Sequence, residues 1–320
     1  MKNLFKKILP FLFMTIGLNV FAQTNNRDFT AIDAYVKSLG PLDSMSMGTI
    51  NNVVSNKFTD KIDTARAIYY WIANSITYDV KAARANNTSK NTPTDVLLYR
   101  KAVGIGFASL FQDMCSSAGI RCLTVDGFVK NSTEDIGEKS TEINHSWAVV
   151  QLGESPDTWY YVDPAFGSGY ADAEMKVFTP AYTDAYFFTD KETFNQQHYP
   201  DNTAWKLGSG PKSKKDFFEL PVIRVAAIEF GLNKYSPNEG NLRVKVNKGI
   251  TFNYTFSNME EITKVELGMG ERKKYKVKEV QFSSSGSSLS FTYKFEDENA
   301  YPVTVFVNGK ELLSYYIEVD

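Results

Sequence analysis

His145 and Asp163 are the side chains of this sequence best suited to acid–base chemistry. They border two short runs rich in aromatic and β-branched residues, 145–152 and 158–162, which are typical of β-strands. Adjacent antiparallel strands joined by a short turn can place the two side chains next to each other. A carboxylate in that position orients an imidazole, which then serves as the base for a nucleophile. We therefore expect His145 as base and Asp163 as its orienting partner.

Gly104 is a further residue of interest, because it stands at the start of a predicted helix. Gly104 opens a stretch, 104–118, whose apolar spacing predicts a helix that ends at Gly119. A thiol at a helix start would have its pKa lowered by the free N–H groups and the helix dipole. Gly104 has no side-chain atom, so no acyl intermediate can form on it. Ser109 and Cys115 lie about 7 and 16 Å further along the same helix, and we expect neither to replace a nucleophile there.

The elements that must position these residues come in two groups. Apolar residues at helical spacing predict helices over 28–39, about 46–58, and from Asp60 onward, and Thr92 with Pro93 can open a short helix. Strand-like residues begin at 121–129, and the polar stretch 131–144 is expected to be a hairpin loop. Helices followed by antiparallel strands predict an α+β fold.

The last hundred residues have a different pattern. Short alternating runs are separated by turn signals, including Asn308 followed by Gly309, which is typical of a type I′ hairpin. Seven such strands are expected, at 242–246, 251–256, 264–267, 275–282, 289–295, 303–307 and 312–319. This number fits an immunoglobulin-like β-sandwich, although the Cys–Trp–Cys pattern is missing.

The N-terminus predicts an exported protein. A basic start, an apolar run at 8–20 and small residues before Ala22 indicate a signal peptide over 1–22. No cysteine follows the cleavage point, so a lipoprotein anchor is not indicated, and no other apolar run has spanning length. We therefore predict a periplasmic or secreted protein without a membrane span after cleavage. The predicted domains are 23–222 and a C-terminal β-sandwich at 223–320.

Charge and ligand spacing limit the partners. A formal net charge of −2 gives no reason to expect nucleic acid. His145 and His198 are far apart in the sequence, and Cys115 and Cys122 lack ligand spacing, so no metal and no cofactor are expected. The two cysteines can form a bridge, as exported proteins allow, or remain buried thiols. His198, which precedes a Tyr-Pro pair, is predicted to be a structural or surface residue in a loop.

The segments together resemble the transglutaminase-like superfamily, and within it the kyphoscoliosis-peptidase-like branch. The similarity extends over about 60–221, and it rests on the runs at 65–79, 100–111, 118–120, 126–128, 144–147, 159–164, 186–190, 198–200 and 205–207. The resemblance implies a papain-like fold with a Cys-His-Asp site. It aligns His145 and Asp163 with the His and Asp, and it places Gly104 where the family has its nucleophilic Cys.

The resemblance leaves three possible functions. The first is an exported pseudoenzyme whose degenerate papain-like cleft binds a peptide, a protein or a cell-wall component. The second is an active cysteine peptidase or transglutaminase-like acyl-transfer enzyme. The third is a structural module whose groove is filled by side chains. His145 is then either a ligand contact or a structural partner of Asp163, and the tryptophans, Trp71 among them, are expected in the core.

Overall fold

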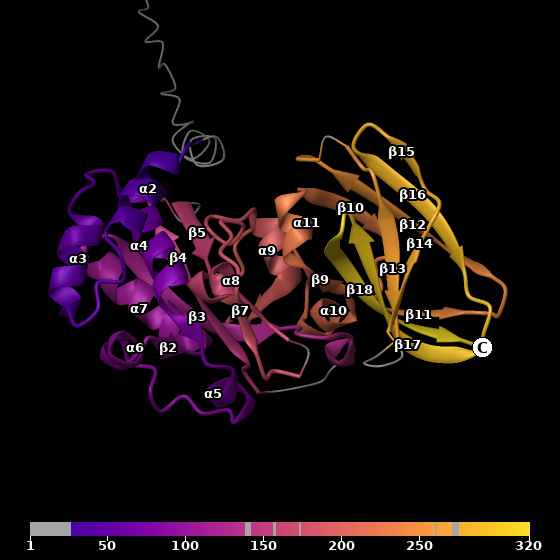
Figure 1. Ribbon diagram of the computed structural model, residues 1–320, viewed down its shortest axis with the longest axis horizontal. Coiled ribbons are helices and arrows are strands. Elements are labelled where there is room, and N and C mark those ends of the chain that lie inside the picture. Colours follow the sequence, from indigo (N-terminus) through magenta and orange to yellow (C-terminus); the bar gives the residue numbers. More distant parts are fainter. Residues whose placement is uncertain (1–26, 138–141, 156–157, 173, 260, 271–274) are drawn as a thin grey trace, which may run out of the picture.

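The computed structural model describes residues 27–137, 142–155, 158–172, 174–259, 261–270 and 275–320. The predicted signal peptide, 1–22, lies outside these residues. None of the helices in the described ranges combines the length and the apolar character needed to cross a membrane. The chain forms a mixed helix-and-sheet part, followed by a part built almost entirely from strands, as Figure 1 shows. The predicted α+β class is confirmed.

The helices gather in the first part of the chain. They are α2 (Thr30–Ser38), α3 (Met47–Ser55), α4 (Lys61–Ser75), α5 (Val80–Arg84), α6 (Pro93–Tyr99), α7 (Gly104–Ser117), α8 (Pro164–Ser168), α9 (Lys191–Gln197) and α10 (Lys214–Glu219). Asp60 caps α4 by accepting the N–H groups of Ile62 and Asp63, as its position predicts. Thr92 caps α6, which has proline in its first turn. The central helix, α7, packs against α4 on one side and against β3 and β4 on the other.

A four-stranded antiparallel sheet has the order β5-β4-β3-β8. Its strands are β3 (Arg121–Val129), β4 (His145–Gln151), β5 (Trp159–Val162) and β8 (His198–Pro200). In β4 the side chains of Ala148 and Val150 join the core under the helices, while Trp147 and Val149 join a second core on the opposite face. The sheet is therefore covered on both faces, which fixes its register firmly.

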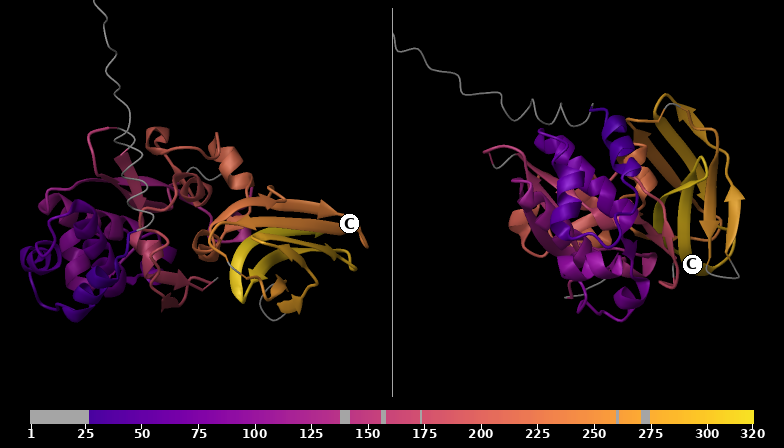
Figure 2. Two further views of the ribbon diagram at one scale, coloured as in Figure 1. Left: turned by 90° about the horizontal axis from the view of Figure 1, so that it is seen from above. Right: turned by 60° about the vertical axis from the view of Figure 1, so that its left-hand side comes forward.

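Two further sheets form a β-sandwich around a separate core of their own (Figures 1 and 2). One contains β10 (Leu232–Ser236), β12 (Gly249–Phe256), β16 (Ser288–Lys294) and β15 (Ser283–Ser285). The other contains β11 (Asn241–Val244), β18 (Lys310–Val319), β17 (Asn299–Val307), β13 (Val265–Met269) and β14 (Lys276–Glu279). Each of the seven predicted runs contains a strand, and the arrangement is consistent with an immunoglobulin-like sandwich. Asn308 and Gly309 both have positive φ, as a type I′ turn requires.

A short strand joins the two parts. β9 (Val222–Ile223) pairs antiparallel with Leu313 and Ser314 of β18, and α11 (Val225–Glu229) follows it. The predicted boundary between 222 and 223 thus falls inside a strand of the sandwich sheet. Glu229 of α11 forms an ion pair with Lys310 and accepts a hydrogen bond from Thr183 of the first part. The sandwich is therefore attached to the helical part by main-chain pairing as well as by side chains.

Candidate functional site

Asp163 is positioned by the junction of β5 and α8. Its Oδ1 accepts the backbone N–H groups of Ala165 at 2.9 Å and Phe166 at 3.0 Å, so the carboxylate caps α8. Pro164 occupies the first position of α8, where its missing N–H costs nothing. The Asp-Pro pair therefore ends the strand and leaves the other carboxylate oxygen, Oδ2, free to face the sheet.

His145 contacts Asp163 as predicted. Its Nε2 lies 2.7 Å from Asp163 Oδ2, and the two side chains are 2% and 0% exposed. Burial alone would raise the pKa of Asp163, but hydrogen bonds and charges from His145 and His198 hold it well below its usual value. An ionised carboxylate only accepts hydrogen bonds, so Nε2 of His145 carries a proton. In neutral His145, Nδ1 is then the acceptor.

A second histidine meets the same carboxylate oxygen. His198 Nε2 lies 3.0 Å from Asp163 Oδ2, and the ring stacks on Phe194 with a centroid distance of 3.9 Å. His198 is completely buried, and burial lowers its pKa to about 4 against the opposing effect of Asp163. The prediction of a loop position was wrong, since His198 begins β8, and a surface role is excluded.

The two histidines are neighbours in space although 53 positions separate them in the sequence. Pairing of β8 with β3, in which His198 lies opposite Val129, brings His198 to the site. β8 has three residues, too few for an alternating pattern to reveal a strand. The sequence therefore did not reveal that His198 belongs to the site. The distance between the two histidines along the sequence is no argument against a shared ligand, because they are neighbours in space.

Gly104 faces the other edge of the His145 ring. A β-carbon at Gly104 would lie 2.6 Å from Nδ1 and 2.9 Å from Cε1 of His145. Gly104 is the first residue of α7, and Val103 before it is held in an extended conformation by a hydrogen bond from its N–H to Asn91 Oδ1. The helix start, the imidazole and the carboxylate thus form one line of contacts, in the order expected from the sequence.

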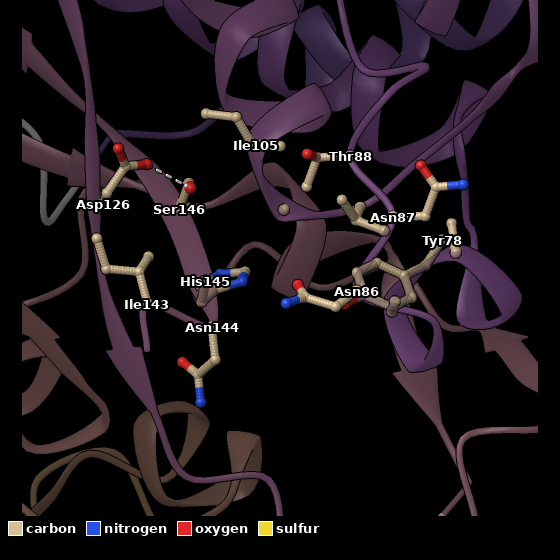
Figure 3. A pocket seen from close by; sticks show the side chains of 14 residues that line it. Tyr78, Asn86, Asn87, Thr88, Ile105, Asp126, Ile143, Asn144, His145 and Ser146 are labelled. Carbon is tan, nitrogen blue, oxygen red and sulfur yellow. Dashed lines mark hydrogen bonds between the residues drawn. The ribbon is translucent and has the colours of Figure 1, made fainter. Parts of the chain in front are cut away.

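A cavity of about 260 Å³ opens beside His145 and the start of α7. In Figure 3 His145 points into it from β4, and Asn86 and Thr88 approach from the opposite side. Among the lining residues that the structure describes, Asp126 is the only acid and none is Lys or Arg. Asp126 accepts a hydrogen bond from Ser146 at 2.6 Å. The groove beside His145 is therefore open, and its walls combine polar and apolar residues, with Asp126 as the one carboxylate among the described lining residues.

Both cysteines are free and buried. Cys115 lies on α7 and Cys122 on β3, and their side chains contact each other. Burial, together with this neighbour, raises the pKa of Cys115 well above its usual value. A thiol in that environment is a poor nucleophile. Of the two alternatives for this pair, the structure has the buried thiols.

Part of the chain is similar to known proteins. Residues 49–164 match the transglutaminase-like superfamily. Kyphoscoliosis peptidase of Mus musculus is 36% identical over 172 residues, which are 52% of this chain and 26% of that protein. Hillarin of Drosophila melanogaster is 24% identical over 230 residues, 66% of this chain and 26% of that protein. The chain therefore covers only about a quarter of the length of these relatives.

Among solved structures, one described as a TGase matches with 18% identity and a TM-score of 0.29. The match covers 52% of this chain and 42% of that chain.

Proposed function

The chain carries a transglutaminase-like domain, and we propose that this domain is an exported pseudoenzyme that binds a peptide, a protein or a cell-wall component beside His145. In this proposal Gly104 occupies the place of the family's nucleophilic cysteine. The observation that carries it is the position of the His145 ring, which lies so close to Gly104 that a β-carbon there would come within 2.6 Å of Nδ1, so the ring occupies the space that a cysteine side chain would need. Without a nucleophile, no covalent acyl intermediate can form next to the His145–Asp163 pair.

The site retains groups that recognise a peptide backbone. In neutral His145 the Nδ1 lone pair can accept a hydrogen bond from a ligand N–H. The first N–H groups of a helix have no partner within the helix, and Gly104 and Ile105, at the start of α7, line the cavity. The backbone N–H groups of these two residues can donate to a ligand carbonyl. A donor and an acceptor side by side match an amide group.

The rest of the lining supports a neutral or amine-bearing ligand. Asn86, Asn87 and Thr88 offer polar side chains without charge. The carboxylate of Asp126 disfavours an acidic group and favours an amine. A peptide or a cell-wall stem peptide with a free amine fits this composition better than a polyanion does.

Export and docking complete the proposal. The predicted signal peptide would deliver the protein to the periplasm or outside the cell, where cell-wall fragments and exported proteins occur. In this proposal the sandwich is an immunoglobulin-like module that docks the protein on a partner. Because the chain covers a small part of its relatives' length, the activities of the whole relatives are not transferred to it.

Binding tests the proposal. We would titrate the full mature chain with neutral, amine-bearing and acidic peptide pools and with soluble peptidoglycan fragments, and follow binding by calorimetry. Ala83→Trp would fill the cavity and should abolish binding, whereas Lys234→Trp on exposed β10 serves as the matched control. If no pool binds, or if Ala83→Trp binds as well as wild type, the proposal fails.

The alternative is an active cysteine peptidase or acyl-transfer enzyme. It requires Cys115 or Cys122 to be a reactive thiol. Native protein would be treated with iodoacetamide at neutral pH, and the same sample after unfolding would serve as the control. Rapid labelling of one thiol in the native state, together with hydrolysis of a peptide substrate, would replace the pseudoenzyme proposal by this alternative.

A further inference from the structure

Three buried side chains from separate segments converge on one point. They are His145 at the start of β4, Asp163 directly after β5, and His198 at the start of β8. One ligand atom from each lies within 4.8 Å of the other two. Both imidazole Nε2 atoms already approach the same oxygen, Asp163 Oδ2, at 2.7 and 3.0 Å. The pseudoenzyme proposal uses Asp163 only to fix which nitrogen of His145 carries the proton, and it gives His198 no role.

We propose that His145 Nε2, His198 Nε2 and Asp163 Oδ2 bind a divalent transition-metal ion, with Zn²⁺ the best match. Two imidazole nitrogens and one carboxylate oxygen form a ligand set that zinc uses when one coordination position stays open for water or a ligand. A harder cation such as Mg²⁺ prefers oxygen ligands and does not match two imidazoles.

The surroundings hold the three ligands in orientation. Asp163 Oδ1 is fixed by the N–H groups of Ala165 and Phe166, so Oδ2 keeps its direction. The His198 ring stacks on Phe194 and meets the edge of Trp147 at a centroid distance of 5.1 Å. Such outer contacts orient metal ligands and improve affinity. The directions of Asp163 Oδ2 and of the His198 ring are therefore set before an ion binds.

The space next to Gly104 supplies the one movement that binding requires. Zinc bonds of about 2.0–2.2 Å place neighbouring ligand atoms more than about 3 Å apart, so the His145 ring must retreat slightly from Asp163. Its Nδ1 edge then moves toward Gly104, which has no side chain to block it. A cysteine at this position would close that space.

Proton positions also permit binding. Each imidazole must release Nε2 to the ion, which happens when its proton moves to Nδ1, so neither protons nor electrons are lost overall. In the zinc-bound state Nδ1 of His145, which borders the cavity, becomes a donor, so it would meet a ligand carbonyl in place of the ligand N–H that it meets without the ion. Nδ1 of His198 is buried without a hydrogen-bond partner, and the Phe194 backbone borders this ring. As a donor, that nitrogen could use the Phe194 carbonyl.

The chain allows a clean test because the sequence contains only two histidines. Tag-free mature protein would be titrated with ZnCl₂ by calorimetry at pH 7.5. We expect one equivalent to bind, and we expect His198→Gln and Asp163→Asn to weaken binding more than about 100-fold, beyond the usual effect of an outer-shell change. Glu279→Gln, at an exposed carboxylate of β14 outside both proposed sites, is the matched control and should bind like wild type, as should Cys115→Ser.

If those variants fail to fold, measurements on the wild-type protein test the zinc site. X-ray absorption of the zinc-loaded chain should show a first shell of nitrogen and oxygen with no sulfur, and Co²⁺ should give the absorption spectrum of a low-symmetry site. Absence of saturable zinc binding, sulfur in the first shell, or wild-type affinity in a folded His198→Gln variant would overturn the proposal.

Discussion

Nδ1 of His145 lies where a side chain at position 104 would have to be: a β-carbon on Gly104 would come within 2.6 Å of that nitrogen. The backbone N–H of Ser146 would be 3.2 Å from the same β-carbon, so the strand limits how far His145 can move. Because β-carbons do not approach other atoms this closely, any substitution at Gly104 must push the imidazole aside. The identity of residue 104 and the position of His145 are therefore coupled.

Gly104→Ala measures this coupling as stability. Gly104 is not among the residues with positive φ, and alanine there would otherwise gain from a smaller backbone entropy loss. We expect the displaced His145 to outweigh that gain and to lower the free energy of unfolding by about 1–3 kcal/mol in urea titrations. Gly48→Ala in α3, where a β-carbon has open space, should be neutral or slightly stabilising. Equal stability of the two variants would contradict the coupling.

Gly104→Cys tests the proposed origin of the site. A thiol at the start of α7 beside His145 should have its pKa lowered below about 8.5. Mass spectrometry should find that it reacts with iodoacetamide near neutral pH faster than the buried Cys115 and Cys122. His145 must rotate to admit the new side chain, and adding His145→Ala should slow the reaction. A new cysteine that titrates like a free thiol, whether or not His145 is present, would show that the pair is no relic of catalysis.

Asp163 and His198 differ in how well their positions could be predicted from the sequence. The strand end at Asp163 could be predicted, because this residue ends a run of aromatic residues and precedes proline, and the family resemblance supplied its pairing with His145. His198 could not, because its place depends on a three-residue strand that pairs with β3, a contact between distant segments. Local patterns predict the elements, while long-range pairing decides which of them meet.

The sandwich illustrates the same limit. The alternating runs predicted its seven principal strands, since alternation directly reflects one buried face. β10, β15 and β9 were not predicted. β15 is a run of serines with no apolar member, and β9 has only two residues. Such strands exist because neighbouring strands offer hydrogen bonds, which a single sequence does not reveal.

Trp71→Ala should be strongly destabilising. Trp71 is 1% exposed within α4, and the guanidinium of Arg100 lies 5.1 Å from its ring. Removing the ring leaves a cavity in the main core, and we expect a loss of about 3–5 kcal/mol in the free energy of unfolding, measured in urea. A loss below about 1 kcal/mol would show that the core closes around the site. Tyr170→Ala, at an exposed aromatic residue, is the control and should change little.

The buried side chain of Lys130 should give the protein an unusual dependence of stability on pH. Its ammonium group is buried, donates to the Phe217 carbonyl at 2.6 Å and lies 3.7 Å from the centre of the Phe217 ring. Burial lowers the pKa of Lys130 to about 7, against the opposing effect of Asp135. In the unfolded chain the lysine keeps its proton up to about pH 10. Between these values the unfolded state binds more protons than the folded state.

The free energy of unfolding should therefore rise as pH increases above 7, by up to about 1.4 kcal/mol per unit from this group. Urea titrations between pH 7 and 8 would measure it, because the buried Cys115 thiol, whose pKa is raised, acts in the opposite direction from about pH 8.5, where the thiol of the unfolded chain loses its proton. Lys130→Met keeps the length of the side chain without the charge and should remove the rise. Lys234→Met, at an exposed lysine, should retain it. A wild-type profile that is flat or falls over this range would mean that the Phe217 carbonyl and ring keep Lys130 charged despite its burial.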